Sequence, residues 1–241
     1  MDVECVFSSA FDGNGALHHI ATADGTQQYT NPHEAEHVVT TMFSSYGSSY
    51  LSPSLFVQHQ HAGPAQNCTA NLPSSWMAVD LGENRSLCVN HYCLRTGQAR
   101  HNLRHWQLQG SADGSTWETL REHTNDFTLS EVPMSTAAWE VEAGGRAFRH
   151  FRILQTGPNS AGTQQLRCAG IELYGTLAGG QGMRGPLSLL GLHGAGADHG
   201  TRAVCDRAHW GLFLPPRAAG VRHLTARWPT ITITARLPLP P

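Results

Sequence analysis

Short runs of alternating apolar and polar residues follow one another through the middle of the chain. The clearest run, 148–154, divides its side chains between two faces. One face carries Phe148, His150, Arg152 and Leu154, and the other carries Arg149, Phe151 and Ile153. Similar runs lie at 76–81, 88–95, 103–109, 117–120, 137–141 and 168–175. Alternation with a period of two predicts β-strands, and many short strands separated by turns predict an all-β sandwich or barrel.

The N-terminal region has a different pattern. Residues 1–30 place turn signals such as Asp12-Gly13 and Asp24-Gly25 around short apolar segments, which predicts a hairpin. Residues 44–75 are rich in Ser, Tyr, Gln, His and Pro and are expected to form long loops.

Four of the six tryptophans lie in the predicted strands: Trp76, Trp106, Trp117 and Trp139. Each side chain can bury a large apolar area, so we expect all four to anchor the core.

The pattern ends near residue 177. A Gly-rich segment begins at Ala178, and 178–241 is a low-complexity tail rich in Gly, Pro and Arg. We therefore expect a β-sandwich at 3–177, with its core at 68–177, and a disordered tail at 178–241.

Composition narrows the range of partners. The net charge of −2 provides no basic field for nucleic acid, and no segment approaches the roughly 20 apolar residues of a membrane span. The first residues show no basic and apolar leader, so a cytoplasmic protein with reduced cysteines is expected.

Five motifs occur in a fixed order and carry a family resemblance. They are Trp76-Met77-Ala78-Val79-Asp80-Leu81-Gly82, His91-Tyr92-Cys93-Leu94-Arg95, Trp106-Gln107-Leu108-Gln109-Gly110-Ser111-Ala112-Asp113-Gly114-Ser115-Thr116-Trp117, Phe148-Arg149-His150-Phe151-Arg152-Ile153 and Gly170-Ile171-Glu172-Leu173-Tyr174-Gly175. Residues 3–177 thereby resemble the F5/8 type C, or discoidin-like, domain. The similarity is greatest to the intracellular branch found in BTB-domain proteins and HECT-type ubiquitin ligases.

This resemblance implies a discoidin-like (galactose-binding-like) jelly-roll β-sandwich of eight strands. It implies loops at one end that bind a glycan, a lipid or a protein, and it implies neither catalysis nor a cofactor. Membrane-binding relatives use exposed apolar loop tips, for which the matching positions are Tyr46, Tyr50, Leu51 and Phe56. Extracellular relatives join their termini by a disulfide. Cys5 and Cys168 could lie near one another in such a fold, but a pair of reduced thiols is the favoured expectation.

The densest polar cluster is the candidate ligand-binding site. It comprises Arg95, Arg100, His101, Asn102 and Arg104, around a loop between two predicted strands. Guanidinium groups suit carboxylate, phosphate or sugar hydroxyls. Ordinary surface charge, with one Arg packed beneath the strands, is the alternative explanation.

Two motifs resemble metal sites. His33-Glu34-Ala35-Glu36-His37 matches the zinc-peptidase pattern, but Pro32 precedes it, strand-forming residues follow it, and no third ligand lies nearby. Cys88, His91 and Cys93 have the right chemistry, but a regular strand would place Cys88 on the opposite face from the other two. No metal or catalytic residue is therefore assigned.

The sequence predicts a non-catalytic module for protein–protein recognition, with a link to the ubiquitin pathway by family analogy. Two alternatives stay open at this point. One is a glycan- or lipid-binding domain resembling a lectin. The other, more remote, is a zinc hydrolase that uses His33, Glu34 and His37.

Overall fold

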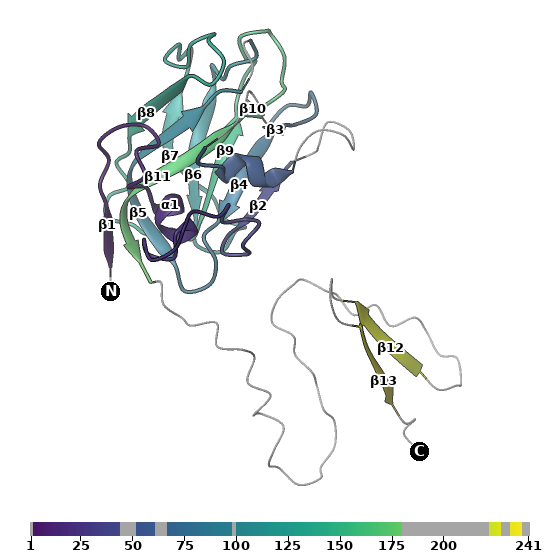
Figure 1. Ribbon diagram of the computed structural model, residues 1–241. Helices are drawn as coiled ribbons and strands as arrows, with labels where there is room; N and C mark the ends of the chain where they lie inside the picture. Colours follow the sequence, from purple (N-terminus) through teal and green to yellow (C-terminus); the bar gives the residue numbers. More distant parts are fainter. Residues whose placement is uncertain are drawn as a thin grey trace. The chain divides into compact units, whose positions relative to one another are not determined.

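The computed structural model describes residues 2–43, 52–60, 67–97, 100–179, 222–227 and 232–237. The chain divides into two compact units, Met1–Pro186 and Leu187–Pro241. Figure 1 shows that the first unit consists mainly of strands and contains very little helix.

The first unit is built on two antiparallel sheets. The four-stranded sheet has the order β1-β11-β5-β8, and the five-stranded sheet has the order β2-β4-β9-β6-β7. The first comprises β1 (Val3–Cys5), β11 (Gly170–Ala178), β5 (Ser86–Arg95) and β8 (Thr136–Glu140). The second comprises β2 (Val39–Met42), β4 (Trp76–Asp80), β9 (His150–Gln155), β6 (Trp106–Ser111) and β7 (Glu118–His123).

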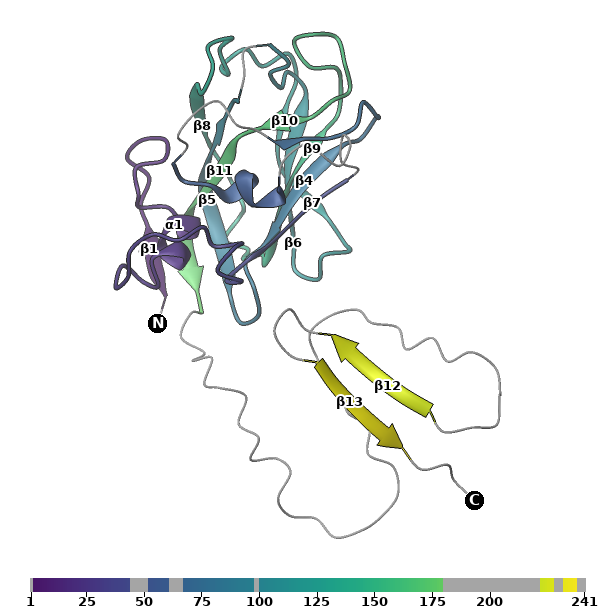
Figure 2. The ribbon, with the colours of Figure 1, turned by 45° about the vertical axis from the view of Figure 1, so that its right-hand side comes forward.

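Three short elements lie outside the two large sheets. A two-stranded sheet pairs β3 (Asn67–Cys68) with β10 (Arg167–Cys168). The 3₁₀ helix η1 (Pro53–Val57) contacts β2 and β11. In Figure 2, η1 is the unlabelled blue coil between the labels of β5 and β4.

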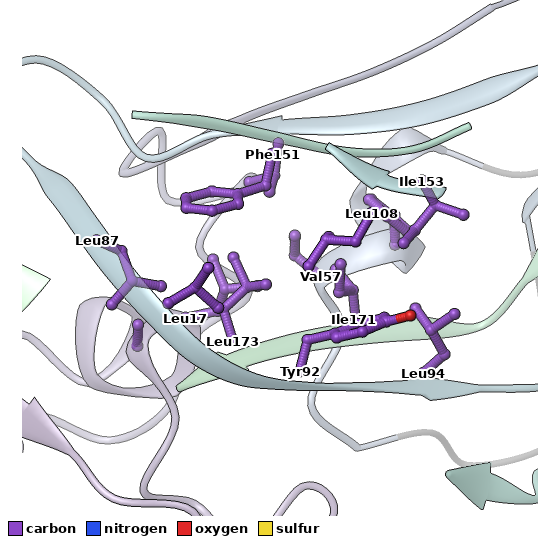
Figure 3. Close-up of a cluster of buried hydrophobic side chains, with 14 of the residues drawn as sticks. Leu17, Val57, Leu87, Tyr92, Leu94, Leu108, Phe151, Ile153, Ile171 and Leu173 are labelled. Carbon is purple, nitrogen blue, oxygen red and sulfur yellow. The ribbon is translucent and has the colours of Figure 1, made fainter. Parts of the chain in front are cut away.

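The core lies between the two sheets. Figure 3 shows Tyr92, Leu94, Ile171 and Leu173 on the four-stranded side, with Phe151, Leu108 and Ile153 opposite them. Strands far apart in sequence therefore meet, as β1 does beside β11. The all-β sandwich expected from the sequence is confirmed.

The prediction of a hairpin in residues 1–30 was wrong. Val3–Cys5 is a strand, but it pairs with β11, and Ala16–Ala21 forms the helix α1. Ala16, Leu17, Ile20 and Ala21 are the buried residues of α1, which is the 3.6-residue spacing of an amphipathic helix. The carboxylate of Glu172 accepts hydrogen bonds from the backbone N–H groups of Leu17 (2.8 Å) and His18 (3.1 Å), and so caps the first turn.

The alternating run at 148–154 contains the strand β9, which begins at His150, two residues later than expected. His150, Arg152 and Leu154 face outward, whereas Phe151 and Ile153 are buried. Phe148 is also buried, because it precedes β9 and forms an isolated bridge with Leu87.

The four tryptophans of the predicted strands divide into two pairs. Trp106 and Trp139 are buried, in agreement with their expected role as core anchors. Trp76 and Trp117 are only half-buried, and Trp76 lies on the outer face of its sheet, beside Leu154. The expectation of a core position was wrong for these two, because alternation alone does not identify which face a strand buries.

In the second unit, β12 (Arg222–Arg227) and β13 (Thr232–Leu237) form an antiparallel pair. Most of the predicted disordered tail lies outside the described residues, so the boundary at 177 and the tail's disorder stay predictions. Within the described part of the chain, no helix has the length and apolar character required to cross a bilayer.

Candidate functional site

The candidate site lies where β5 leads into β6. We use "loop end" for the described parts of three loops, 96–105, 124–135 and 156–166. Asn102 joins them: its N–H donates to Ser160 Oγ (3.0 Å), its carbonyl accepts from Ser160 N (2.9 Å), and its Nδ2 donates to the Ser130 carbonyl (2.7 Å). One buried residue, through its backbone and its side-chain amide, thus links all three loops.

Arg104 holds the middle of the 124–135 loop in place. Its Nη1 donates to the carbonyls of Leu103 (3.0 Å) and Leu129 (3.0 Å), and its Nη2 donates to Glu131 Oε1 (2.9 Å). The side chain is buried beneath the ring of Phe127, which lies 4.9 Å from its guanidinium carbon. These donors are occupied internally, so Arg104 organises the loop.

Arg95 is also turned inward. Its Nη2 donates to the His59 carbonyl (2.7 Å), its Nη1 donates to the Gln58 carbonyl (3.2 Å), and its guanidinium lies 3.7 Å from the centre of the Phe11 ring. Arg95 therefore joins the N-terminal segment and the segment after η1 to the four-stranded sheet.

Arg100 and His101 form the outward part of the sequence-predicted cluster. Arg100 is exposed and His101 is half-buried. Both have positive φ angles, 70° and 65°. Burial lowers the pKa of His101, and the charge of Arg167 lowers it further. Of the five candidates, the structure thus places Arg95, Asn102 and Arg104 inside, and Arg100 and His101 at the surface.

Beneath the loop end lies a chain of hydrogen bonds that the sequence analysis missed. We call Tyr92, Trp106, His123, Asp126 and Trp139 the "buried network". Trp106 Nε1 donates to the Tyr92 hydroxyl (2.9 Å), which lies 2.8 Å from His123 Nε2. His123 Nδ1 lies 2.7 Å from Asp126 Oδ2, which also accepts from Trp139 Nε1 (3.1 Å).

The donor roles within this network form one consistent sequence. The Tyr92 oxygen accepts from Trp106, so its own proton is directed to His123 Nε2. The remaining proton of a neutral His123 then lies on Nδ1 and points to Asp126. Burial lowers the pKa of His123, which favours this neutral form. The only sequence signal was a histidine at a strand end, three residues before an aspartate.

Two large apolar side chains project from the 124–135 loop. Phe127 is 72% exposed and Val132 is 63% exposed, although Leu129 between them is buried. The family resemblance led us to expect exposed apolar side chains on a different loop, 44–67. Of the expected tips, Phe56 is buried in η1, and Tyr46, Tyr50 and Leu51 lie outside the described residues.

The zinc-peptidase motif does not form the helix that such a site requires. Residues 33–37 form turns, in which His33 Nδ1 accepts from Thr40 N (3.1 Å) and His37 Nδ1 faces the Ile20 carbonyl (3.2 Å). Val39, just after this motif, pairs with Asp80, at the opposite end of β4 from the loop end. No group of three or more metal-ligating side chains occurs among the described residues.

The cysteine expectations need two corrections. Cys5 lies beside Gly175 near the end of β11, whereas Cys168 pairs with Asn67 just before that strand begins, so the two are far apart. In β5, the alternation shifts at the bulge opposite Gly175. Leu87, Val89, Tyr92 and Leu94 belong to the core, so Cys88 shares the outer face with His91 and Cys93. The five cysteines in the described residues are free thiols.

No family model matches the chain. A BTB/POZ domain-containing protein of Arabidopsis thaliana is 36% identical over 171 residues, 68% of this chain and 21% of that protein. The E3 ubiquitin-protein ligase hecd-1 of Caenorhabditis elegans is 37% identical over 180 residues, 73% of this chain and 7% of the ligase. The E3 ubiquitin-protein ligase Ufd4 of Drosophila melanogaster is 36% identical over 176 residues, 70% of this chain and 6% of the ligase.

The chain thus spans about a fifth or less of the length of these relatives. Among solved structures, CpGH89CBM32-5 of Clostridium perfringens, in complex with GalNAc-β-1,3-galactose, has 15% identity and a TM-score of 0.44, over 58% of this chain and 96% of its own. A chitosan-binding module of Paenibacillus sp. IK-5 has 17% identity and a TM-score of 0.43, over 58% and 96%. Likeness at this level gives no argument about a ligand.

Proposed function

Since the chain carries a discoidin-like, F5/8 type C β-sandwich of the branch found in BTB-domain proteins and ubiquitin ligases, we propose that it is a non-catalytic recognition module. It binds a protein partner inside the cell through the loop end. The observation that carries this proposal is the pair of exposed apolar side chains, Phe127 and Val132. They lie on a loop whose carbonyls accept hydrogen bonds from the buried side chains of Arg104 and Asn102.

Preorganisation is the physical reason to favour this surface. Ordering a loop on binding has an entropic cost, which is smaller when the loop is already held in place. Asn102 and Arg104 bind carbonyls of the 124–135 loop, and Asp126 belongs to the buried network. Phe127 is therefore presented on a fixed base, with Arg100 and His101 on the neighbouring loop as polar contacts.

A protein partner fits this surface better than a glycan does. A sugar site needs polar groups free to bind hydroxyls beside an aromatic ring. Here the donors of Arg104 are bound to carbonyls and to the Glu131 carboxylate, and Nδ2 of Asn102 is bound to the Ser130 carbonyl. The guanidinium of Arg104 also lies against the Phe127 ring. Apolar anchors with a polar rim are typical of protein interfaces.

The buried network supports a structural role in place of catalysis. Both ring nitrogens of His123 face protein partners, and Oδ2 of Asp126 is shared by His123 and Trp139. The network therefore leaves His123 no ring nitrogen for a substrate proton. The link to ubiquitin is proposed from the two ligase relatives, in which a segment like this one would recruit a partner of the ligase.

The test is partner recovery from cytosol by the tagged full-length chain, with quantitative mass spectrometry. We expect Phe127→Ser combined with Val132→Ser to reduce specific partners about tenfold, a loss of about 1.4 kcal/mol. Val6→Ser is the matched control, because Val6 is 64% exposed but lies outside the loop end. Equal recovery by the double variant and wild type would contradict the proposal.

Glycan arrays and liposome flotation, with the same variants, test the two alternative ligands. Binding to either that depends on Phe127 would replace the protein partner. Arg100→Ala with His101→Ala measures the polar contribution, for which we expect a smaller loss of about threefold.

A further inference from the structure

A second surface lies on the outer face of the five-stranded sheet. The strand register aligns Thr41, Ala78, Arg152, Gln109 and Thr119 in one row across all five strands. Arg152 occupies β9, the central strand of the sheet. A cation thus stands near the middle of a face that does not contact the core.

The guanidinium of Arg152 is held in place, but only its Nε takes part in a side-chain hydrogen bond among the described residues. Its Nε donates to Gln109 Oε1 (2.7 Å), and its carbon lies 4.2 Å from the centre of the Trp117 ring. Gln109 is itself fixed, because its Nε2 donates to Gln107 Oε1 (2.9 Å) and to Thr119 Oγ1 (3.3 Å). We call Gln107, Gln109, Trp117, Thr119 and Arg152 the "outer cluster".

No carboxylate neutralises Arg152 among the described residues. Asp80, in the adjacent row, binds Arg149 through both oxygens at 2.6 and 2.7 Å. Glu118 is paired with Arg146. Burial lowers the pKa of Arg152 without an acidic group to oppose it. The two Nη groups therefore form an open fork, the geometry that binds a carboxylate with two hydrogen bonds.

Apolar side chains lie one row away from Arg152. Trp76 pairs with Leu154 across β4 and β9, and both are half-buried on the outer face. The Phe43 ring centre is 6.3 Å from that of Trp76. Leu154 is two residues from Arg152 along β9, a separation of about 7 Å, which equals the spacing of alternate side chains in an extended peptide.

We propose that this face binds an extended acidic segment of a partner protein, with a carboxylate on Arg152 and an apolar side chain two residues away on Trp76 and Leu154. The charge complementarity identifies the occupant: a desolvated, unpaired guanidinium favours a carboxylate over a neutral group. This surface is separate from the loop end, so each can fail without the other.

The experiment selects from a displayed library of random 12-residue peptides on the full-length protein and on Arg152→Gln. We expect wild type to enrich Asp or Glu two positions from an apolar residue, and Arg152→Gln to lose that enrichment. The consensus peptide, labelled with fluorescein, should bind Arg152→Gln about tenfold more weakly in fluorescence polarisation. No acidic enrichment on wild type, or equal enrichment on both proteins, would overturn the proposal.

Three further variants sharpen the test. Arg152→Lys keeps the charge but not the fork, and should lose about threefold; it also serves if Arg152→Gln does not fold, as judged by circular dichroism. Glu122, exposed on β7 opposite Gln107, should repel the peptide, so Glu122→Gln should strengthen binding about twofold. Phe127→Ser with Val132→Ser should leave peptide affinity unchanged, which separates this surface from the loop end.

Discussion

The buried network and the outer cluster contain the same kinds of residue, but they differ in how many of their polar groups have a partner within the protein. Each combines tryptophan with polar and ionisable side chains. In the buried network, both ring nitrogens of His123 have partners within the protein. In the outer cluster, Arg152 donates only from Nε and has no ion pair among the described residues. The first arrangement is that of a structural element, and the second is the one that we propose binds a partner.

The largest expected effect separates the two clusters by stability. Trp106→Ala should lower the free energy of unfolding by about 3–5 kcal/mol, because it creates a cavity in the core. It also removes the hydrogen bond to Tyr92. Trp117→Ala is the matched control and should cost only about 1 kcal/mol, since its ring is already partly in water. Urea unfolding measures both, and equal losses would show that the outer cluster is part of the core.

Asp126→Asn tests the buried network directly. The amide should leave a donor facing His123 or Trp139, so we expect a loss of about 2 kcal/mol in the free energy of unfolding. Glu131→Gln, which alters the exposed partner of Arg104, is the control and should cost less than about 1 kcal/mol. The network would have no structural role if the two variants were equally stable.

Acidification should weaken the fold through His123. Burial holds its pKa below the ordinary value of 6.5, so the unfolded chain binds more protons than the folded one below that pH. The stabilisation is complete above pH 6.5 and is lost as the pH falls towards the folded-state pKa. His59, with its pKa lowered by burial to about 4, contributes in the same direction between pH 6.5 and 4.

The measurement is the free energy of unfolding from pH 7.5 to 4.5, compared with His123→Phe. The variant should keep the stacking on Trp106 but show a flatter pH profile. Burial raises the pKa of Glu172 to about 7, which acts in the opposite direction. The difference between the two curves therefore isolates His123, and parallel curves would refute its role.

The smallest effect on stability is expected for Arg152→Gln. It removes one side-chain hydrogen bond and the contact with Trp117, for a cost below about 1 kcal/mol. Its influence should instead appear as the loss of acidic peptides. A large loss of stability would mean that Arg152 is part of the fold, as His123 is.

The sequence by itself determined the fold class and most strands of the first unit. Alternation marked β5, β6, β8, β9 and β11, because a strand with one buried face imposes a period of two on its residues. Asp113-Gly114 marked the turn between β6 and β7, where Gly114 has φ of +73°. The order of motifs also identified the branch of relatives later found by comparison.

Only the tertiary structure decided what the polar and aromatic residues do. Nothing in the sequence distinguishes Arg104 from Arg100. In the structure, Arg104 binds a carbonyl of a loop more than 20 residues away, whereas Arg100 is exposed. Trp106 and Trp117 likewise cannot be told apart in the sequence, because only the packing of the two sheets determines which strand face is buried. The reason is that alternation is a local property, whereas burial and hydrogen-bond satisfaction depend on contacts between strands far apart in the chain.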